Sequence, residues 1–167
     1  MELIENVFLD IDNLMQMPVV LLSLVLLSGV AAFVDFKTLK IPNKLNVVIL
    51  IVNTYVFIIR PILAGKEEAW SYASSHLLSG AFLFLLFLGV AIATGFKMAG
   101  DIKFVGSFGI ALGWIAFPFL GLALIFNLLT NLTVIKLKKK TISNIIPFAP
   151  FFFMSFVTII IAYVSFI

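Results

Sequence analysis

The sequence predicts an all-α protein, a polytopic bundle of about six membrane-spanning helices. Of its 167 residues, 63% are hydrophobic and only 11% are charged, and the mean hydropathy is +1.23. A soluble core of this size cannot enclose so many apolar side chains. Because each crossing helix uses roughly 20 apolar residues, such a bundle occupies nearly the whole chain. We therefore expect a single transmembrane domain over residues 1–167.

Apolar runs and their boundaries locate the helices in chain order. Residues 1–17 carry acids and no base, which fits a short interfacial helix ahead of the first span. Spans are then expected at about 18–34, 45–63 and 73–95. Pro42 disfavours helical geometry in the residue before it and suits a helix start just after it, so it marks the beginning of the second span.

The apolar run over residues 104–135 would be about 48 Å long as one helix, too long for an ordinary crossing. We expect two helices with a break around Gly113 to Pro118, and a last helix at about 145–166. With this break, most of the eleven basic residues fall on one side of the membrane. These residues are Lys37, Lys40, Lys44, Lys97, Lys103, Lys136, Lys138, Lys139 and Lys140. The positive-inside rule makes that side cytoplasmic and places both termini outside.

Asp35 and Asp101 are the candidate chemical centre. Among the eight acidic residues, these two fall on the lysine-bearing side, each at the end of an apolar segment. A carboxylate at the membrane edge is costly to bury. Two carboxylates that lie close together share one proton, as in the aspartic proteases. One then acts as a base on water while the other, protonated, polarises a peptide carbonyl.

From the residues alone, a structural interpretation of the two aspartates is about equally good. Each would be an ordinary helix-end residue paired with a nearby lysine, Asp35 with Lys37 or Lys40 and Asp101 with Lys97 or Lys103. The absence of cysteine excludes disulfides and thiol nucleophiles.

Several other polar and small residues fit packing roles. His76 lies far from the aspartates in this topology, so packing or interhelical hydrogen bonding is favoured over catalysis. Asn46, Asn53 and Asn127 are interpreted as interhelical hydrogen bonders. The spacing Gly109-x-x-x-Gly113 allows a neighbouring helix to approach closely.

Three motifs occur in a fixed order along the chain. They are Asp35-x-x-Thr38-x-x-Ile41-Pro42-Asn43, Gly100-Asp101-Ile102-Lys103-Phe104 and Ile146-Pro147-Phe148-Ala149-Pro150-Phe151. Together they resemble the motifs of the type IV prepilin peptidase family of aspartic membrane proteases. The resemblance implies that Asp35 and Asp101 are catalytic. It implies supporting roles for Thr38, Ile41, Pro42, Asn43, Gly100, Lys103, Pro147 and Pro150.

The chain departs from the family pattern in two places. Met98 stands where the family usually has the first glycine of its second motif. The cysteine-bearing cytoplasmic insert of the larger, bifunctional members is missing. The resemblance therefore implies a minimal peptidase, similar to those of tight-adherence pilus systems, that cleaves without N-methylation.

The resemblance also implies a substrate and a location. The substrate is a prepilin-like precursor, cut between a short basic leader and a hydrophobic segment, at the cytoplasmic face of a prokaryotic cell membrane. No cofactor, metal or nucleic acid is expected, and the oligomeric state stays open. Lys37, Lys40 and Lys97 are possible attractors of an acidic residue near the start of the mature pilin, although the positive-inside rule accounts for them and is favoured.

Two other function classes stay open. A proton- or ion-coupled transporter would use the same aspartates as ion sites, but would place them near the membrane midplane beside broken helices. An inactive assembly subunit of a pilus or secretion machine would keep the motifs without the reaction.

Overall fold

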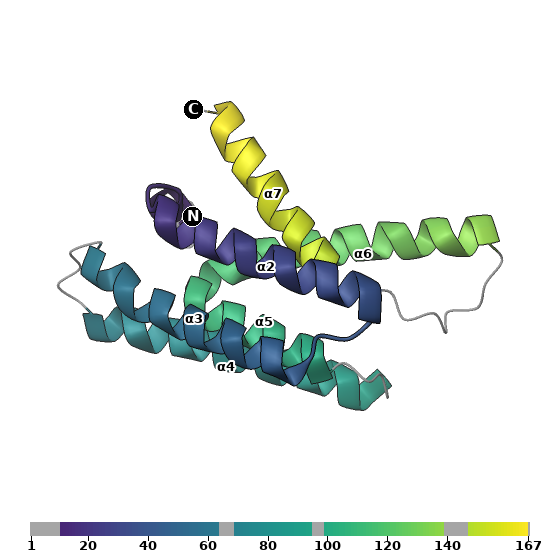
Figure 1. The fold of residues 1–167 in the computed structure, drawn as a ribbon, viewed down its shortest axis with the longest axis horizontal. Helices are drawn as coiled ribbons and strands as arrows, with labels where there is room; N and C mark the ends of the chain where they lie inside the picture. Colours follow the sequence, from purple (N-terminus) through teal and green to yellow (C-terminus); the bar gives the residue numbers. More distant parts are fainter. Residues whose placement is uncertain (1–10, 64–68, 95–98, 139–146, 167) are drawn as a thin grey trace. The chain divides into compact units, whose positions relative to one another are not determined.

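The computed structural model describes residues 11–63, 69–94, 99–138 and 147–166, and every regular element in these ranges is helical (Figure 1). The α-helices are α2 (Pro18–Thr38), α3 (Asn43–Leu63), α4 (Ala69–Thr94), α5 (Ala99–Leu112), α6 (Ala116–Lys138) and α7 (Ala149–Phe166). Residues 11–15 are also helical. The predicted all-α fold class is confirmed.

Several helices have the length and composition of membrane spans. Three stretches are long and apolar enough to cross a membrane, Pro18–Thr38, Tyr72–Ala93 and Ala99–Thr133. Two shorter apolar helices are Asn43–Ile59 and Ala149–Ser165. Since the backbone groups of a helix are satisfied within the helix, this architecture suits hydrocarbon. The chain is a membrane protein.

The helices that carry the two aspartates extend beyond their apolar runs. The first was predicted to end at residue 34, but α2 continues to Thr38, so Asp35 lies inside its last turn. Lys37 in that turn compensates the negative end of the helix dipole. Likewise α5 begins at Ala99, before the predicted residue 104, because Asp101 suits the positive end of its first turn.

The predicted break in the long apolar run over residues 104–135 is confirmed. The α-helix ends at Leu112, a 3₁₀ turn covers Gly113–Ile115, and α6 begins at Ala116. Gly113 has a φ of 64°, a left-handed conformation that glycine adopts without strain. A Cβ at this position would lie 2.7 Å from Nε2 of His76, so the site has no space for a side chain.

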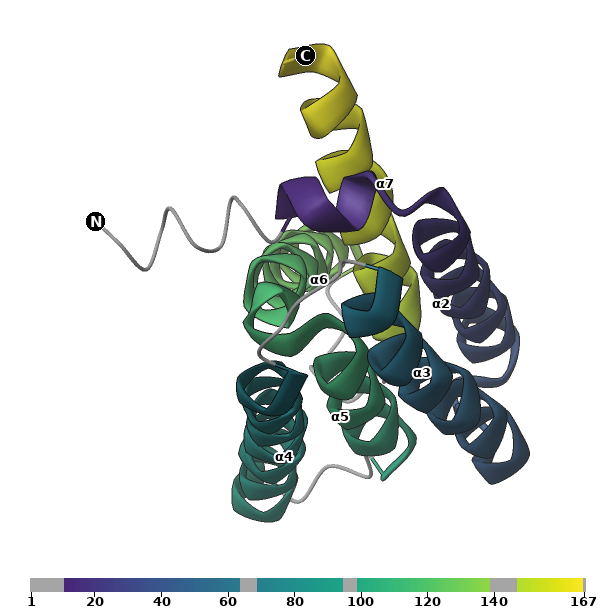
Figure 2. The same ribbon diagram turned by 90° about the vertical axis from the view of Figure 1, so that its left-hand side faces the viewer.

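The chain groups into two compact units, the first made of Met1–Leu24 and Pro42–Ala116, the second of Val25–Ile41 and Phe117–Ile167. In the first unit, α5 packs against both α3 and α4, which contact each other much less (Figure 2). Asn46 and Asn53 of α3 pair with Gly100 and Ser107 of α5, so these two helices run parallel.

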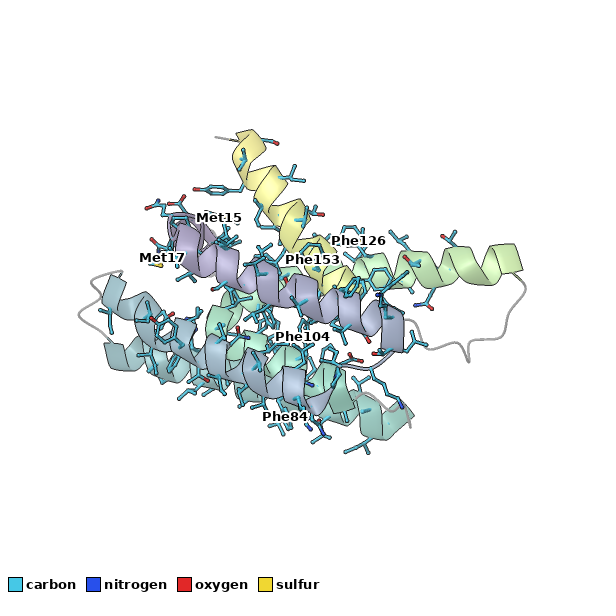
Figure 3. All side chains as sticks on the ribbon, viewed as in Figure 1. Met15, Met17, Phe84, Phe104, Phe126 and Phe153 are labelled. Atoms are coloured by element: carbon cyan, nitrogen blue, oxygen red, sulfur yellow. The ribbon has the colours of Figure 1, made fainter. Side chains whose placement is uncertain are left out.

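The α4–α5 contact brings two helix backbones together. A Cβ on Gly109 would lie 2.8 Å from the Cα of Gly80, and one on Gly80 would lie 3.0 Å from the carbonyl oxygen of Gly106. A Cβ on Gly106 would lie 3.0 Å from Cβ of Phe84, which Figure 3 labels on α4. The expected close approach at Gly109 is confirmed, and these pairs show that α4 runs antiparallel to α5.

Two side chains of α4 bond to backbone carbonyls at the end of α5 and in the 3₁₀ turn that follows it. Nδ1 of His76 lies 3.0 Å from the carbonyl oxygen of Ile110. Because a carbonyl oxygen only accepts, this ring nitrogen carries the proton. The hydroxyl of Ser79 donates to the carbonyl oxygen of Gly113 at 2.7 Å. The interhelical role expected for His76 is confirmed, since carbonyls near a helix end need partners from outside the helix.

In the second unit, aromatic side chains of α7 pack against α2 and against α6. A Cβ on Gly29 would lie 3.3 Å from the ring of Phe153, a residue labelled in Figure 3. The ring of Phe156 stacks on that of Phe119, with centroids 4.3 Å apart. The last helix was predicted to start near residue 145; Pro147 and Phe148 are not helical, and α7 begins at Ala149.

We predict that Gly109→Ala destabilises the protein by about 1 to 3 kcal/mol, because a methyl group at this contact forces the α4 and α5 backbones apart. Thermal unfolding in a mild detergent measures the effect. Gly89→Ala is the matched control, because a Cβ at Gly89 meets nothing within 4 Å and alanine favours the helix. Equal melting temperatures for the two variants would contradict the close contact.

Candidate functional site

Asp35 lies in the second unit, near the end of α2, and its carboxylate caps α7. Its side chain is only 3% exposed. The backbone N–H of Ala149, the first residue of α7, donates to Oδ2 of Asp35 at 3.0 Å. The N–H of Phe148 interacts with the same carboxylate. A helix N-terminus offers unpaired N–H groups and positive potential, so this is a favourable place for a carboxylate.

The end of α2 fixes the backbone that carries Asp35. The N–H of Leu39 bonds to the carbonyl oxygen of Asp35 at 2.7 Å. Leu39 has a φ of 55°, the left-handed conformation that commonly ends a helix. The hydroxyl of Thr38 lies 2.9 Å from the carbonyl oxygen of Val34 and 2.7 Å from that of Lys40. Thr38, a predicted motif residue, therefore ties the last turn of α2 to the segment that follows.

Asp101 lies in the first unit, in the first turn of α5. A carboxylate at this position is stabilised by the helix dipole. The preceding residue, Gly100, uses its carbonyl oxygen to accept a hydrogen bond from Nδ2 of Asn46 at 3.3 Å. The beginning of α5 is therefore held by α3.

A second bond joins the starts of these two helices. Nζ of Lys103 donates to Oδ1 of Asn43 at 2.8 Å. Asn43 is the last residue of the first sequence motif and Lys103 belongs to the second. The carbonyl oxygen of Pro42 accepts from the N–H of Asn46 at 3.0 Å, so α3 begins at the Pro42–Asn43 pair as predicted. The first unit thus brings motif residues from two distant segments into direct contact.

The remaining predicted residues fall into three groups. Ile41 is buried, whereas Lys37 and Lys40 are exposed. Nζ of Lys37 lies 4.3 Å from the ring centroid of Phe33, one turn earlier on α2, a cation–π contact. Lys97 and Met98 lie outside the described residues.

The asparagines expected to join helices do so in two of three cases. Asn46 bonds to Gly100, and Nδ2 of Asn53 donates to Oγ of Ser107 at 2.8 Å, both between α3 and α5. For Asn127 the interhelical role stays a prediction, because the bond described for its side chain lies within α6, where its Oδ1 accepts from Nδ2 of Asn131 at 2.7 Å. At a spacing of four residues, two such side chains lie on the same face of one helix.

Sequence reasoning missed the role of Phe148 and Ala149. Their contribution to the site is a backbone N–H, and neither side-chain type signals it. The available signal was the flanking prolines: Pro147 and Pro150 have no N–H, so the two residues between them carry the only donors of this tetrapeptide.

Within residues 11–63, 69–94, 99–138 and 147–166, no group of three or more His, Asp or Glu side chains is placed to hold a metal ion.

Comparisons with known proteins gave no match: none was found among protein-family models, among curated proteins or among solved structures.

We predict that Asp35→Ala lowers stability by about 0.5 to 2 kcal/mol, the usual cost of losing a helix N-cap. Asp35→Asn should lose less, because its amide oxygen still accepts from Ala149. Thermal unfolding of the wild type and both variants in the same detergent checks this order. If the alanine variant were as stable as the asparagine variant, the carboxylate would not be acting as the cap of α7.

Proposed function

We propose that this protein is a membrane-embedded aspartic endopeptidase that removes the short leader peptide from type IV prepilin-like precursors. The observation that carries the proposal is that the first motif is hydrogen-bonded to each of the other two. Asn43 of the first motif bonds to Lys103 of the second, and Asp35 of the first bonds to Ala149 of the third. Asn43 and Lys103, both chosen from the sequence alone and 60 positions apart, are hydrogen-bonded neighbours. Asp35 is bonded to a backbone N–H of the third motif, 114 positions away.

The resemblance implies a joint role for the two aspartates. Only four residues, Leu39 to Pro42, separate α2, whose last turn contains Asp35, from α3. The start of α3 is bonded in turn to the first turn of α5, which contains Asp101. In the proposed enzyme the two carboxyl groups act as one pair.

The proposed reaction needs two carboxyl groups that share a proton. The ionised carboxylate takes a proton from a water molecule, whose oxygen attacks the carbonyl carbon of the scissile peptide bond. The protonated partner donates a hydrogen bond to the carbonyl oxygen and stabilises the tetrahedral intermediate. Collapse of this intermediate breaks the C–N bond, and a proton passes to the leaving amine. No covalent intermediate with the enzyme forms.

The proposed location follows from the charge distribution. Lys37, Lys40, Lys44 and Lys103 flank the segments that hold the aspartates, and loops rich in lysine face the cytoplasm. We therefore place the reaction at the cytoplasmic face of the membrane, and the family resemblance implies that the cell is prokaryotic. A precursor with a basic leader on that side and an apolar helix in the membrane would present its cleavage site there.

We predict that Asp35→Asn and Asp101→Asn each lower cleavage by about a hundredfold to ten-thousandfold, the usual contribution of a general acid or base. The assay is co-expression with a precursor that carries a lysine-rich leader and an apolar segment of about 20 residues, read as a mobility shift. Asp35→Asn keeps an acceptor for Ala149, so this variant tests the charge and not the cap.

Asp12→Asn is the matched control. Asp12 lies ahead of α2 and accepts from Nε2 of Gln16 at 2.8 Å, so this variant should cleave at the wild-type rate. All four proteins must be inserted in the membrane in equal amounts. Cleavage that survives either Asp35→Asn or Asp101→Asn would contradict the two-aspartate mechanism. Absence of cleavage by the wild type would refute the proposed function and favour a transporter or an inactive assembly subunit.

A further inference from the structure

The tetrapeptide Pro147 to Pro150 directs all of its backbone donors to one carboxylate. Proline has no N–H, so Phe148 and Ala149 hold the only two donors of this segment. The N–H of Ala149 lies 3.0 Å from Oδ2 of Asp35, and the N–H of Phe148 interacts with the same group. Both backbone groups are hydrogen-bond donors, so the carboxylate of Asp35 is the acceptor.

The next donors of α7 are used within the helix. The N–H groups of Phe151 and Phe152 bond to the carbonyl oxygen of Phe148 at 3.0 and 3.3 Å. Ala149 is therefore the residue of this first turn whose N–H is directed to another helix. Ala149 is 0% exposed, so bulk water does not compete for the bond, and a hydrogen bond in such surroundings is electrostatically stronger than in water.

The start of α7 is itself held in place by aromatic packing. The rings of Phe148 and Phe152 lie 6.4 Å apart, and those of Phe152 and Phe156 lie 5.5 Å apart. Phe156 stacks on Phe119 of α6, and Phe153 packs over Gly29 of α2. The two N–H groups are thus fixed relative to the helix that carries Asp35, which limits rotation of its carboxylate.

We propose that the N–H groups of Phe148 and Ala149 position the Asp35 carboxylate for catalysis, an inference that rests on the proposed peptidase function. A carboxylate has about four lone-pair sites, so the bond from Ala149 and the interaction with Phe148 orient it and leave capacity for the reacting water. Phe148 and Ala149 are positioning residues, because they act on the reaction through Asp35. Displacement of a reacting group by about 1 Å costs roughly a hundredfold in rate. Holding the Asp35 carboxylate in position therefore preserves the rate of cleavage.

The test replaces the Ala149 N–H alone. Cell-free synthesis of the full chain with lactic acid in place of Ala149 converts one amide into an ester and removes this donor. The matched control places lactic acid at Ala162, a second alanine on α7. Ala149→Pro is the encoded second variant, since proline suits the first position of a helix. Each purified protein cleaves a synthetic precursor with a lysine-rich leader followed by an apolar segment.

We expect the ester at Ala149 to lower kcat by about tenfold to a hundredfold while KM changes less than about twofold, because substrate binding does not use this bond. The ester at Ala162 should leave both constants at wild-type values, and Ala149→Pro should behave like the ester at Ala149. Equal kcat for the two esters would overturn this inference and leave the peptidase intact, and so would a rise in KM without loss of kcat. No cleavage by the wild-type protein would overturn both proposals.

Discussion

Hydrocarbon contains no water to satisfy polar groups, and this constraint determines how the helices of this protein are joined. Side-chain and backbone polar groups in the described residues bond across helix boundaries, and most of these bonds fall at helix ends. Asn46 bonds to the carbonyl of Gly100, His76 to that of Ile110 and Ser79 to that of Gly113. At the start of α7 the direction is reversed, and a backbone N–H donates to Asp35. Each bond satisfies an exposed end of one helix with a group from another.

In the first unit, most of the contacts between helices involve α5. It contacts α4 through Gly106 and Gly109 and contacts α3 through Lys103 and Ser107. Its two ends are both fixed, the first turn by α3 and the carbonyl end by α4. A side chain in that first turn, Asp101, is therefore attached to a rigid element. Sites on helices held in this way keep their geometry better than sites on loops.

The sequence was sufficient to predict features set by length and by single residues. The break at Gly113 followed from a run too long for one crossing, and the role of His76 followed from its isolation. The helix ends at Asp35 and Asp101 were predicted too short, because hydropathy detects where lipid contact ends, whereas Lys37 and Asp101 stabilise a further turn through the helix dipole. The partner of Asp35 lies 114 residues away and is a backbone N–H. The flanking prolines single out the donors, but nothing in the sequence pairs them with Asp35.

Asp35 caps α7 with a buried charge, although a neutral side chain could cap the helix without the free-energy cost of burying that charge. Asparagine, serine or threonine satisfies an N-terminal N–H about as well as aspartate, and none of them carries a charge into a site where the side chain is 3% exposed. Burial of a carboxylate is unfavourable unless several hydrogen bonds compensate for lost solvation. The Pro-Phe-Ala-Pro segment supplies the bond from Ala149 and an interaction with the N–H of Phe148, and a neutral cap would need no such compensation. A structural role alone therefore leaves the charge of Asp35 unexplained, and a reaction that uses a carboxylate as base accounts for both the charge and the donors that hold it. The same argument is weaker for Asp101, because a half-buried aspartate in a first helical turn is an ordinary stabilising feature.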